Sequence, residues 1–502
     1  MEFLTANTVV PKEPNQKSFQ GTIRTFSYFL LFAFLFLLPF HAFLVTWMRG
    51  MGLDSIWVTL WREIILGILT VLAVANVTWG RLFVTMKRSV ITLSHTPVTL
   101  SLSKGESESW QVRLKKIRLL DWLIAAYFLL GAVYFFYKRE SMEQWLLGAR
   151  YDFEFLYFYL LVRIFAFGEK EIRGFLKSAL FAAVLVVIFG WILNFLPQNF
   201  LTQFGYAPYA DEWSQKTAVF ACHYVEFDQN FCRMQSTFGG PGRYGLYLLF
   251  VIIASGVMAR SERATKQSQP VSAFWPLFFL LSLGALYLTL SRSAWIGLFG
   301  VIGIGVFFFI KNLSQWKRIF WKSALIALPV ALIFTFLSPI SFETIFLRPA
   351  SSSAHFEALA KGIQTVMENP FGIGLGKAGP ASIPFEKFLT ENAYLQIAVE
   401  MGWLGGVLFL AILIVILREI ACGDRPTASS MSFSSERLPQ TTTSDRKSPQ
   451  ILHHPLATIT LLTLIALMIS GLFVHSFEEM SLNLTLFGFI GLLSCKYQHA
   501  SF

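Results

Sequence analysis

The chain has 502 residues, of which 55% are hydrophobic and only 14% are charged, and it contains 52 phenylalanines. A soluble protein of this length could not bury so much apolar surface, so the composition excludes a soluble globular enzyme and predicts a membrane protein. The net charge of +11 is spread over short loops without a basic helix, so nucleic acid is not an expected partner.

Apolar stretches of about 20 residues, long enough to cross the hydrocarbon core as helices, recur along the whole chain. We therefore predict an all-α, polytopic membrane protein with about twelve transmembrane helices and two long extracytoplasmic loops. The first apolar run, 26–48, has no small-residue cleavage site after it, so we expect a span and not a signal peptide. The predicted divisions are a cytoplasmic N-terminal segment (1–25), about five spans (26–196), an outer loop (197–243), further spans (244–340), a large outer loop (341–393), one span (394–417), a cytoplasmic disordered linker (418–455), and the last two spans with the C-terminus (456–502).

Lysine and arginine residues orient these predicted spans, because cytoplasmic loops carry an excess of positive charge. If the N-terminus is cytoplasmic, the basic loops near residues 81–118, 260–266 and 311–322 all lie inside. Both termini are then cytoplasmic, and the two long loops are outside. The linker between the last spans is rich in Ser, Thr and Pro, a composition typical of a solvated segment without a fixed fold.

The two outer loops contain signals of local structure. Cys222 and Cys232 both lie in the first loop, outside the reducing cytoplasm, so they form either a short disulfide or two unpaired thiols. In the second loop, the segment AHFEALAKGIQTVM places Phe356, Leu359, Ile363, Val366 and Met367 on one helical face. This pattern predicts an amphipathic helix that lies on the membrane or on other spans.

The sequence lacks the usual signatures of a metal or cofactor site. Its eight histidines show no metal-ligand spacing apart from the adjacent His453 and His454, and no HExxH or CxxC motif occurs. The run GIGLGKAG (372–379) has the composition of a phosphate-binding loop, but no strand precedes it and Pro380 prevents a dinucleotide-fold helix after it. We expect a tight turn at this run, and no metal or cofactor in the protein.

Polar side chains gather at the predicted outer ends of the spans. They are Arg233 and Arg243 beside a Gly-Gly-Pro-Gly turn, Arg292, Arg348, His355, the neighbours Glu391 and Asn392, and His475. Arginine on the outer side contradicts the positive-inside bias, and its planar guanidinium matches phosphate oxygens. A single outer arginine is also compatible with a lipid headgroup contact, whereas three arginines beside Gly-rich turns indicate a shared anionic partner.

Four segments resemble, in order, motifs of the O-antigen ligase and O-antigen polymerase superfamily, bacterial membrane glycosyltransferases that use undecaprenyl-diphosphate-linked glycans. They are RMQSTFGGPGRYGLYL, LTLSRSAWIGL, MENPFGIGLG and ENAYLQIAVEMGWLGG, which cover roughly residues 230–410. The resemblance implies a multi-pass protein of the bacterial inner membrane with its active site on the extracytoplasmic side. It also implies metal-independent, inverting transfer of glycan to an acceptor, either lipid A core, a protein or a growing glycan.

The resemblance further implies roles for the polar residues at the outer ends. The candidate substrate-binding residues are Arg233, Arg243, Arg292, Arg348, Asn392 and His475, with the arginines on the diphosphate, and the candidate bases are Glu391 and His355. Two departures matter: Pro241-Gly242 stands where the family has Pro-Asn, and Glu391 stands at the histidine of the ligases. A glutamate can act as a general base when burial raises its pKa, so both ligation and polymerisation stay open. Alternatively, Glu391 complements a helix dipole and Asn392 caps that helix.

The competing hypothesis is a membrane transporter of a small anion or of a lipid-linked glycan. A transporter is expected to carry ionisable residues near the bilayer midplane, in broken helices of two repeated halves. The charges identified above lie at one face and no repeat is visible, so the sequence favours chemistry on a lipid-anchored donor. Arg62 and Glu63, at the start of the second predicted span, are expected to contact neighbouring helices or to cap their own.

Overall fold

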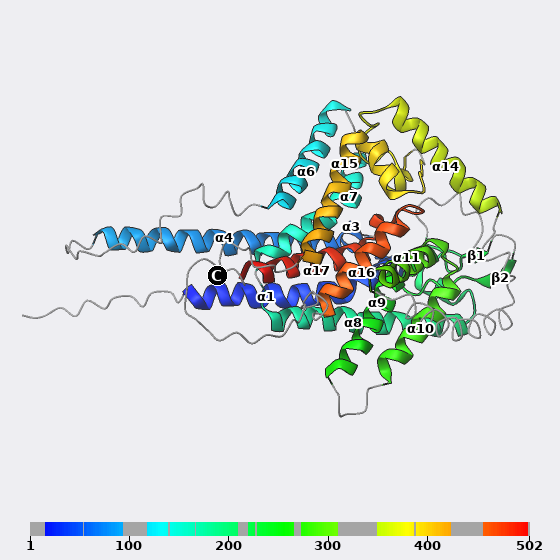
Figure 1. The fold of residues 1–502 in the computed structure, drawn as a ribbon, viewed down its shortest axis with the longest axis horizontal. Coiled ribbons are helices and arrows are strands. Elements are labelled where there is room, and N and C mark those ends of the chain that lie inside the picture. Colours follow the sequence, from blue (N-terminus) through cyan, green and yellow to red (C-terminus); the bar gives the residue numbers. More distant parts are fainter. Residues whose placement is uncertain are drawn as a thin grey trace, which may run out of the picture.

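The protein folds as a helical bundle with a small hairpin and a lateral helix at one end (Figure 1). The computed structural model describes residues 16–53, 55–93, 118–138, 141–165, 167–208, 219–225, 228–265, 273–309, 349–385, 388–422 and 455–499. The predicted all-α class is confirmed. Within the described ranges, strand is confined to β1 (Tyr224–Val225), β2 (Asp228–Cys232) and one isolated bridge.

The helices follow the apolar stretches of the sequence. In chain order they are α1 (Gln16–Leu37), η1 (Leu38–Phe40), α2 (His41–Gly50), α3 (Ile56–Thr59), α4 (Trp61–Leu93), α6 (Leu119–Tyr137), α7 (Met142–Ile164), α8 (Glu169–Phe195), η2 (Phe200–Phe204), α9 (Pro241–Thr265), α10 (Phe274–Thr289), α11 (Arg292–Phe309), α14 (Pro349–Glu368), η3 (Gly379–Ser382), α15 (Ala393–Cys422), α16 (Pro455–Ser470), η6 (Ser476–Glu478) and α17 (Met480–His499).

Six stretches of the described part are long and apolar enough to cross a membrane: Gly21–Gly50, Trp61–Thr78, Leu119–Tyr137, Glu169–Phe195, Pro241–Glu262 and Ala393–Ala421. Shorter apolar helices are Phe274–Thr289, Arg292–Gly305, Pro455–Ser470 and Met480–Ser494. A multi-pass membrane protein is therefore confirmed. The count of twelve and the loop boundaries remain predictions, and the predicted span near residue 331 lies outside the described residues.

The last helix forms the centre of the bundle. All residues of α17 from Met480 to Ser494 are buried, which is expected of a helix that is apolar on every side. Its closest neighbour is α7, and the rings of Phe155 and Phe487 lie 4.6 Å apart between centroids. A Cβ on Gly491 would lie 2.8 Å from the Tyr159 carbonyl oxygen, so only glycine permits this approach of the two helices.

Helix α15 is interrupted at Met401 and Gly402, where the backbone leaves the helical conformation and Gly402 has φ +67°. The run 372–379 is the predicted turn, and it docks against this interruption. Residues 370–374 make three hydrogen bonds to α15: Ile373 N–H to Val399 O (2.8 Å), Gly374 N–H to Glu400 O (3.0 Å) and Trp403 N–H to Pro370 O (3.1 Å). Tyr134 Oη also donates to Phe371 O. The turn thus replaces hydrogen bonds that a continuous helix would have made.

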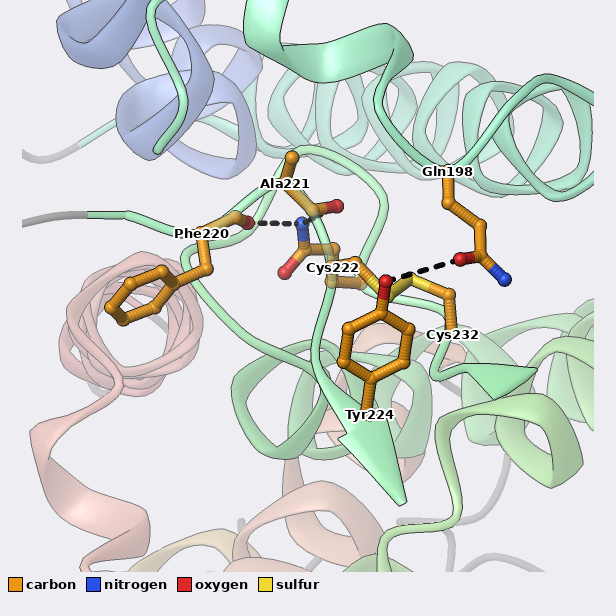
Figure 2. Close-up of a disulfide and its surroundings, with 7 residues drawn as sticks. Gln198, Phe220, Ala221, Cys222, Tyr224 and Cys232 are labelled. Atoms are coloured by element: carbon orange, nitrogen blue, oxygen red, sulfur yellow. Dashed lines mark hydrogen bonds between the residues drawn. A yellow bond between two sulfur atoms is a disulfide. The ribbon is translucent and has the colours of Figure 1, made fainter. Parts of the chain in front are cut away.

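A disulfide-linked hairpin stands at the outer end of the bundle. Strands β1 and β2 pair antiparallel with Tyr224 opposite Cys232, and Cys222 and Cys232 form a disulfide across a Cα–Cα distance of 5.4 Å. Of the two alternatives left by the sequence, the structure contains the disulfide. Figure 2 shows it next to the hydrogen bond that Tyr224 Oη donates to Gln198 Oε1 (3.2 Å).

The amphipathic helix predicted in the second loop is present as α14. The predicted composition of its apolar face was partly wrong, because Val366 is buried against α15 and does not share the exposure of Phe356. Phe356, Ile363 and Met367 remain 71%, 51% and 69% exposed on another side. These apolar side chains are not covered by the described part of the protein, so they form an exposed apolar stripe at this end of the bundle.

Candidate active site

The turn between α10 and α11 brings two predicted arginines to the same place. Arg233 donates from Nε to the carbonyl oxygen of Thr289 (2.9 Å) and from Nη2 to that of Leu290 (3.5 Å). Arg292 begins α11 two residues later. The backbone of Met234 also donates to Leu288 O (3.0 Å), so the segment after β2 is fixed along the end of α10. These contacts place Arg233 beside the turn that carries Arg292.

Helix α14 joins this turn to the start of α15. Arg292 donates from Nη1 to Ser352 Oγ (2.8 Å), and one turn further along α14 His355 Nδ1 lies 3.4 Å from Glu391 Oε2. The two side chains that the sequence offered as alternative bases are therefore partners. Both are reachable from solvent, since His355 is 41% exposed and Glu391 is 25% exposed.

Asn392 fixes the start of α15 to the turn after α16. Asn392 Oδ1 accepts from Leu395 N–H (2.8 Å), which makes it the N-cap, and its Nδ2 donates to Leu472 O (3.0 Å). The capping interpretation of Asn392 thus has geometric support. His475 follows in the same turn, and its pKa is lowered to about 4 by burial and by the nearby charge of His355. A neutral imidazole is therefore the stable form of His475.

Three residues other than glycine in the described part have a left-handed backbone: Ser236 (φ 52°), Leu290 (φ 51°) and Glu391 (φ 51°). Each lies in one of the motif segments that contain Arg233, Arg292 and Glu391. Such a conformation costs a residue with a side chain about 1–2 kcal/mol and is found preferentially at functional sites. Packing holds Ser236 in place, because its Oγ donates to Val186 O (2.7 Å). The backbone is thus strained at the same three points where the candidate residues converge.

Arg243 lies on the first turn of α9, beside the Gly-Gly-Pro-Gly turn, where its Nη1 would be 3.5 Å from a Cβ built on Gly239. Its Nε is 3.8 Å from Glu479 Oε2; the arginine side chain is 52% exposed and the glutamate is 8% exposed. Burial raises the pKa of Glu479, and the positive charges of Arg243 and Arg62 oppose this effect. Arg243 therefore connects the Gly-Gly-Pro-Gly turn to a set of charged side chains inside the bundle.

We call this set the inner polar cluster. It contains Arg62 and Glu63 on α4, Arg150, Asp152 and Glu154 on α7, Gln396 and Glu400 on α15, and Glu478 and Glu479 at η6. Glu63 Oε1 forms an ion pair with Arg150 Nε at 2.6 Å, so the expected contact of Arg62 and Glu63 with a neighbouring helix is present. Glu400 Oε1 accepts from Ala378 N–H (3.0 Å), and Gln396 donates to Glu478. Burial raises the pKa of Glu478.

The inner polar cluster was not predicted from the sequence. It corrects the inference that the charged residues lie only at one face of the protein. Glu400 lies seven residues into α15, which is about 10 Å of helical rise, so ionisable groups are not limited to the outer ends. The signal was available in the run GARYDFEFL, where Arg150, Asp152 and Glu154 interrupt an otherwise apolar helix. Charges inside a span are costly and usually functional.

Two further predictions concern Arg348 and the absence of a metal site. Arg348 lies outside the described residues, so its proposed contact with substrate stays a prediction. Within the described ranges, no group of three or more His, Cys, Asp or Glu side chains is arranged to hold a metal ion.

The fold and these contacts together define a polytopic helical membrane protein in which Arg233 and Arg292 are linked through α14 to a histidine–carboxylate pair. Residues 277–410 match the family model described as O-antigen ligase, which confirms the resemblance to the O-antigen ligase and polymerase superfamily. The matched part includes Arg292, Ser352, His355 and Glu391, whereas Arg233 and Arg243 precede it. No curated protein matches the chain.

Proposed function

We propose that the protein transfers a glycan from an undecaprenyl-diphosphate carrier to an acceptor hydroxyl on the extracytoplasmic face of the bacterial inner membrane. The proposal is carried by the convergence of α11, α14 and α15 through the contacts Arg292–Ser352 and His355–Glu391. Ser352 and His355 are three residues apart, so they share one face of α14. Helix α14 thus binds the guanidinium of Arg292 on one turn and carries the base His355 on the next.

The arginines serve the donor. Arg233 and Arg292 bind the diphosphate through charge-assisted hydrogen bonds, and Arg243 and Arg348 extend the positive field toward the carrier. These bonds strengthen as the bond between the anomeric carbon and the phosphate oxygen breaks, because negative charge then accumulates on the leaving diphosphate. Guanidinium groups provide this stabilisation without a metal ion, which supports a metal-independent reaction.

His355 and Glu391 serve the acceptor. The Nδ1 atom of His355 faces the Glu391 carboxylate, so Nε2 is the nitrogen that takes the proton from the acceptor hydroxyl. The hydroxyl oxygen forms the bond to the anomeric carbon while the diphosphate leaves with the electrons of the broken bond. A single displacement of this kind inverts the anomeric configuration. Asn392 supports the turn beside this pair through its bond to Leu472 O, and His475 lies in the same turn, where it can contact the substrate.

The base assignment is tested with the purified protein and an undecaprenyl-diphosphate-linked glycan, scored for released undecaprenyl diphosphate and for product length. We expect His355→Gln to reduce turnover by about 10²–10⁴, the usual effect of losing a general base. Glu391→Gln should cost less, because it removes only the orienting charge. Glu357→Gln, on an exposed side of the same helix, is the matched control and should be unaffected. Near-normal turnover in both His355→Gln and Glu391→Gln would disprove this mechanism.

A second candidate function is the transport of a small anion or of a lipid-linked glycan. It is favoured by the inner polar cluster beside the interrupted α15, since broken helices next to buried charges are typical of transporter sites. Reconstitution in liposomes separates the two. Movement of the lipid-linked glycan between leaflets without release of undecaprenyl diphosphate would support transport, and release with glycan transfer would support the enzyme.

A further inference from the structure

His223 is a largely buried histidine for which the proposed reaction has no role so far. It follows Cys222, and Arg233 follows Cys232, so the disulfide joins the two neighbouring positions of the hairpin. The backbone N–H of Arg233 donates to the carbonyl oxygen of His223 at 2.9 Å. The hairpin and the disulfide therefore hold His223 and Arg233 next to each other.

The imidazole of His223 faces the Gly-Gly-Pro-Gly turn of the first motif. Its Nε2 would lie 3.7 Å from a Cβ built on Gly240, and Nε2 has no hydrogen-bond partner within the described ranges. The ring packs edge-on against Phe220, with centroids 5.9 Å apart and planes at 90°. One edge of the ring is thus fixed by packing, and Nε2 lies beside Gly240, which has no side chain.

The charged groups around His223 are Arg233 and Arg243. Burial, and then the positive charge of these two arginines, lowers the pKa of His223 to about 4. The ring is therefore neutral at physiological pH and still offers one N–H donor. A neutral donor between two cations adds direction to an anion site without adding a third positive charge that would repel the other two.

We infer that His223 belongs to the diphosphate site, where its Nε2–H donates a hydrogen bond to a phosphate oxygen of the carrier between Arg233 and Arg243. This inference rests on the glycan transfer proposed above. Gly239 and Gly240 can yield to an approaching phosphate oxygen because no side chain has to be displaced. No proton is transferred by His223. Its hydrogen bond strengthens as charge develops on the leaving group and thereby contributes to the rate.

Two substitutions separate the hydrogen bond from the packing of the ring. His223→Phe keeps an aromatic ring against Phe220 and removes the donor, whereas His223→Gln keeps an N–H donor and removes the ring. We expect His223→Phe to lower kcat/KM by about 10²–10³, as does loss of a comparable donor elsewhere, and His223→Gln to lower it less. Tyr224→Phe removes the bond to Gln198 from the same hairpin and should retain normal transfer.

A binding measurement makes the test independent of turnover. Inorganic pyrophosphate should raise the thermal unfolding temperature of the wild-type protein, and His223→Phe should need at least tenfold more pyrophosphate for the same shift. Thiol alkylation followed by mass measurement shows whether the disulfide is intact in each variant. If pyrophosphate protection depends on His223 while the wild type releases no undecaprenyl diphosphate, the anion site stands and the proposed transfer fails.

Two results would overturn the inference for His223. In the first, His223→Phe equals the wild type in both transfer and pyrophosphate protection. In the second, the Phe and Gln variants lose transfer equally, yet pyrophosphate still protects both at wild-type concentrations. The second result would assign the ring a purely structural role in the hairpin.

Discussion

Arg292 depends on the residues around it for its position. Leu290, two residues before it, has a left-handed backbone (φ 51°), and Arg233 donates to the carbonyl groups of this turn. A residue with a side chain pays about 1–2 kcal/mol for such a conformation, so surrounding contacts have to maintain it. The strained turn therefore positions the guanidinium of Arg292 at the first turn of α14, where Ser352 Oγ accepts its hydrogen bond.

Replacing Arg292 by lysine tests whether the guanidinium fork matters beyond its charge. Lysine keeps one positive charge but cannot contact Ser352 and a phosphate in the same planar geometry. A charged hydrogen bond contributes about 1.5–3 kcal/mol, so we expect Arg292→Lys to lower kcat/KM by roughly 10- to 100-fold. The control is Arg173→Lys on α8, at a side chain that is 68% exposed. Equal kcat/KM for the two variants would contradict the assigned role of Arg292.

Single residues were predicted from the sequence to different extents. His355 and Glu391 were both identified, because a charged residue at the outer end of a span is conspicuous in the sequence. Their contact was not predicted, since it depends on how the end of one helix meets another. His223 gave no signal at all: an isolated histidine in a loop becomes informative only when the hairpin places it beside Arg233.

At the scale of one element, the interruption of α15 can be tested at Gly402. Its φ of +67° costs other residues about 1–2 kcal/mol, and a Cβ there would also lie 2.5 Å from the Pro370 carbonyl oxygen. We expect Gly402→Ala to lower the thermal unfolding temperature of the detergent-solubilised protein. Gly67→Ala is the matched control, because a Cβ on this α4 glycine meets nothing within 4 Å. An unchanged unfolding temperature for Gly402→Ala would show that α15 tolerates a continuous helix.

The positions of the helices followed from hydropathy, but the shape of α15 did not. A stretch of about 20 apolar residues has few alternatives to a helix in a membrane, so its location is well determined by composition. Gly402 lies inside such a stretch, and glycine also occurs in regular transmembrane helices. Whether it breaks the helix depends on the turn that contains Gly372, which supplies the replacement hydrogen bonds from outside α15.

For the whole molecule, the predicted orientation places both termini in the cytoplasm and residues 197–243 and 341–393 outside. The measurement is labelling of single introduced cysteines with a membrane-impermeant maleimide in intact cells. A cysteine at Gln203 should be labelled from outside, and one at Ser434 should react only after permeabilisation. Labelling in the opposite sense would place the His355–Glu391 pair on the cytoplasmic side and remove the basis for extracytoplasmic glycan transfer.

The inner polar cluster shows the limit of sequence reasoning at this scale. Its charges come from α4, α7, α9, α15 and η6, and no local pattern links Glu63 with Arg150 or Arg243 with Glu479. Such pairs form because buried charges need partners, and the partner is chosen by three-dimensional packing. The sequence did indicate that α7 carries unusual charge, and it could not indicate which helices would neutralise it.

The interruption of α15 also has a consequence for the order in which the protein assembles during synthesis. The interrupted backbone bonds to Tyr134, whose Oη donates to Met401 O (3.3 Å), and to Pro370, Ile373 and Gly374, and all four precede α15 in the chain. They have left the ribosome before α15 is complete, so the broken helix meets its partners as soon as it is inserted. Glu478, the partner of Gln396, is translated about eighty residues later. The residues that bond to the break in α15 are therefore made before it, whereas the contact of Gln396 with Glu478 forms only after the last helices have been synthesised.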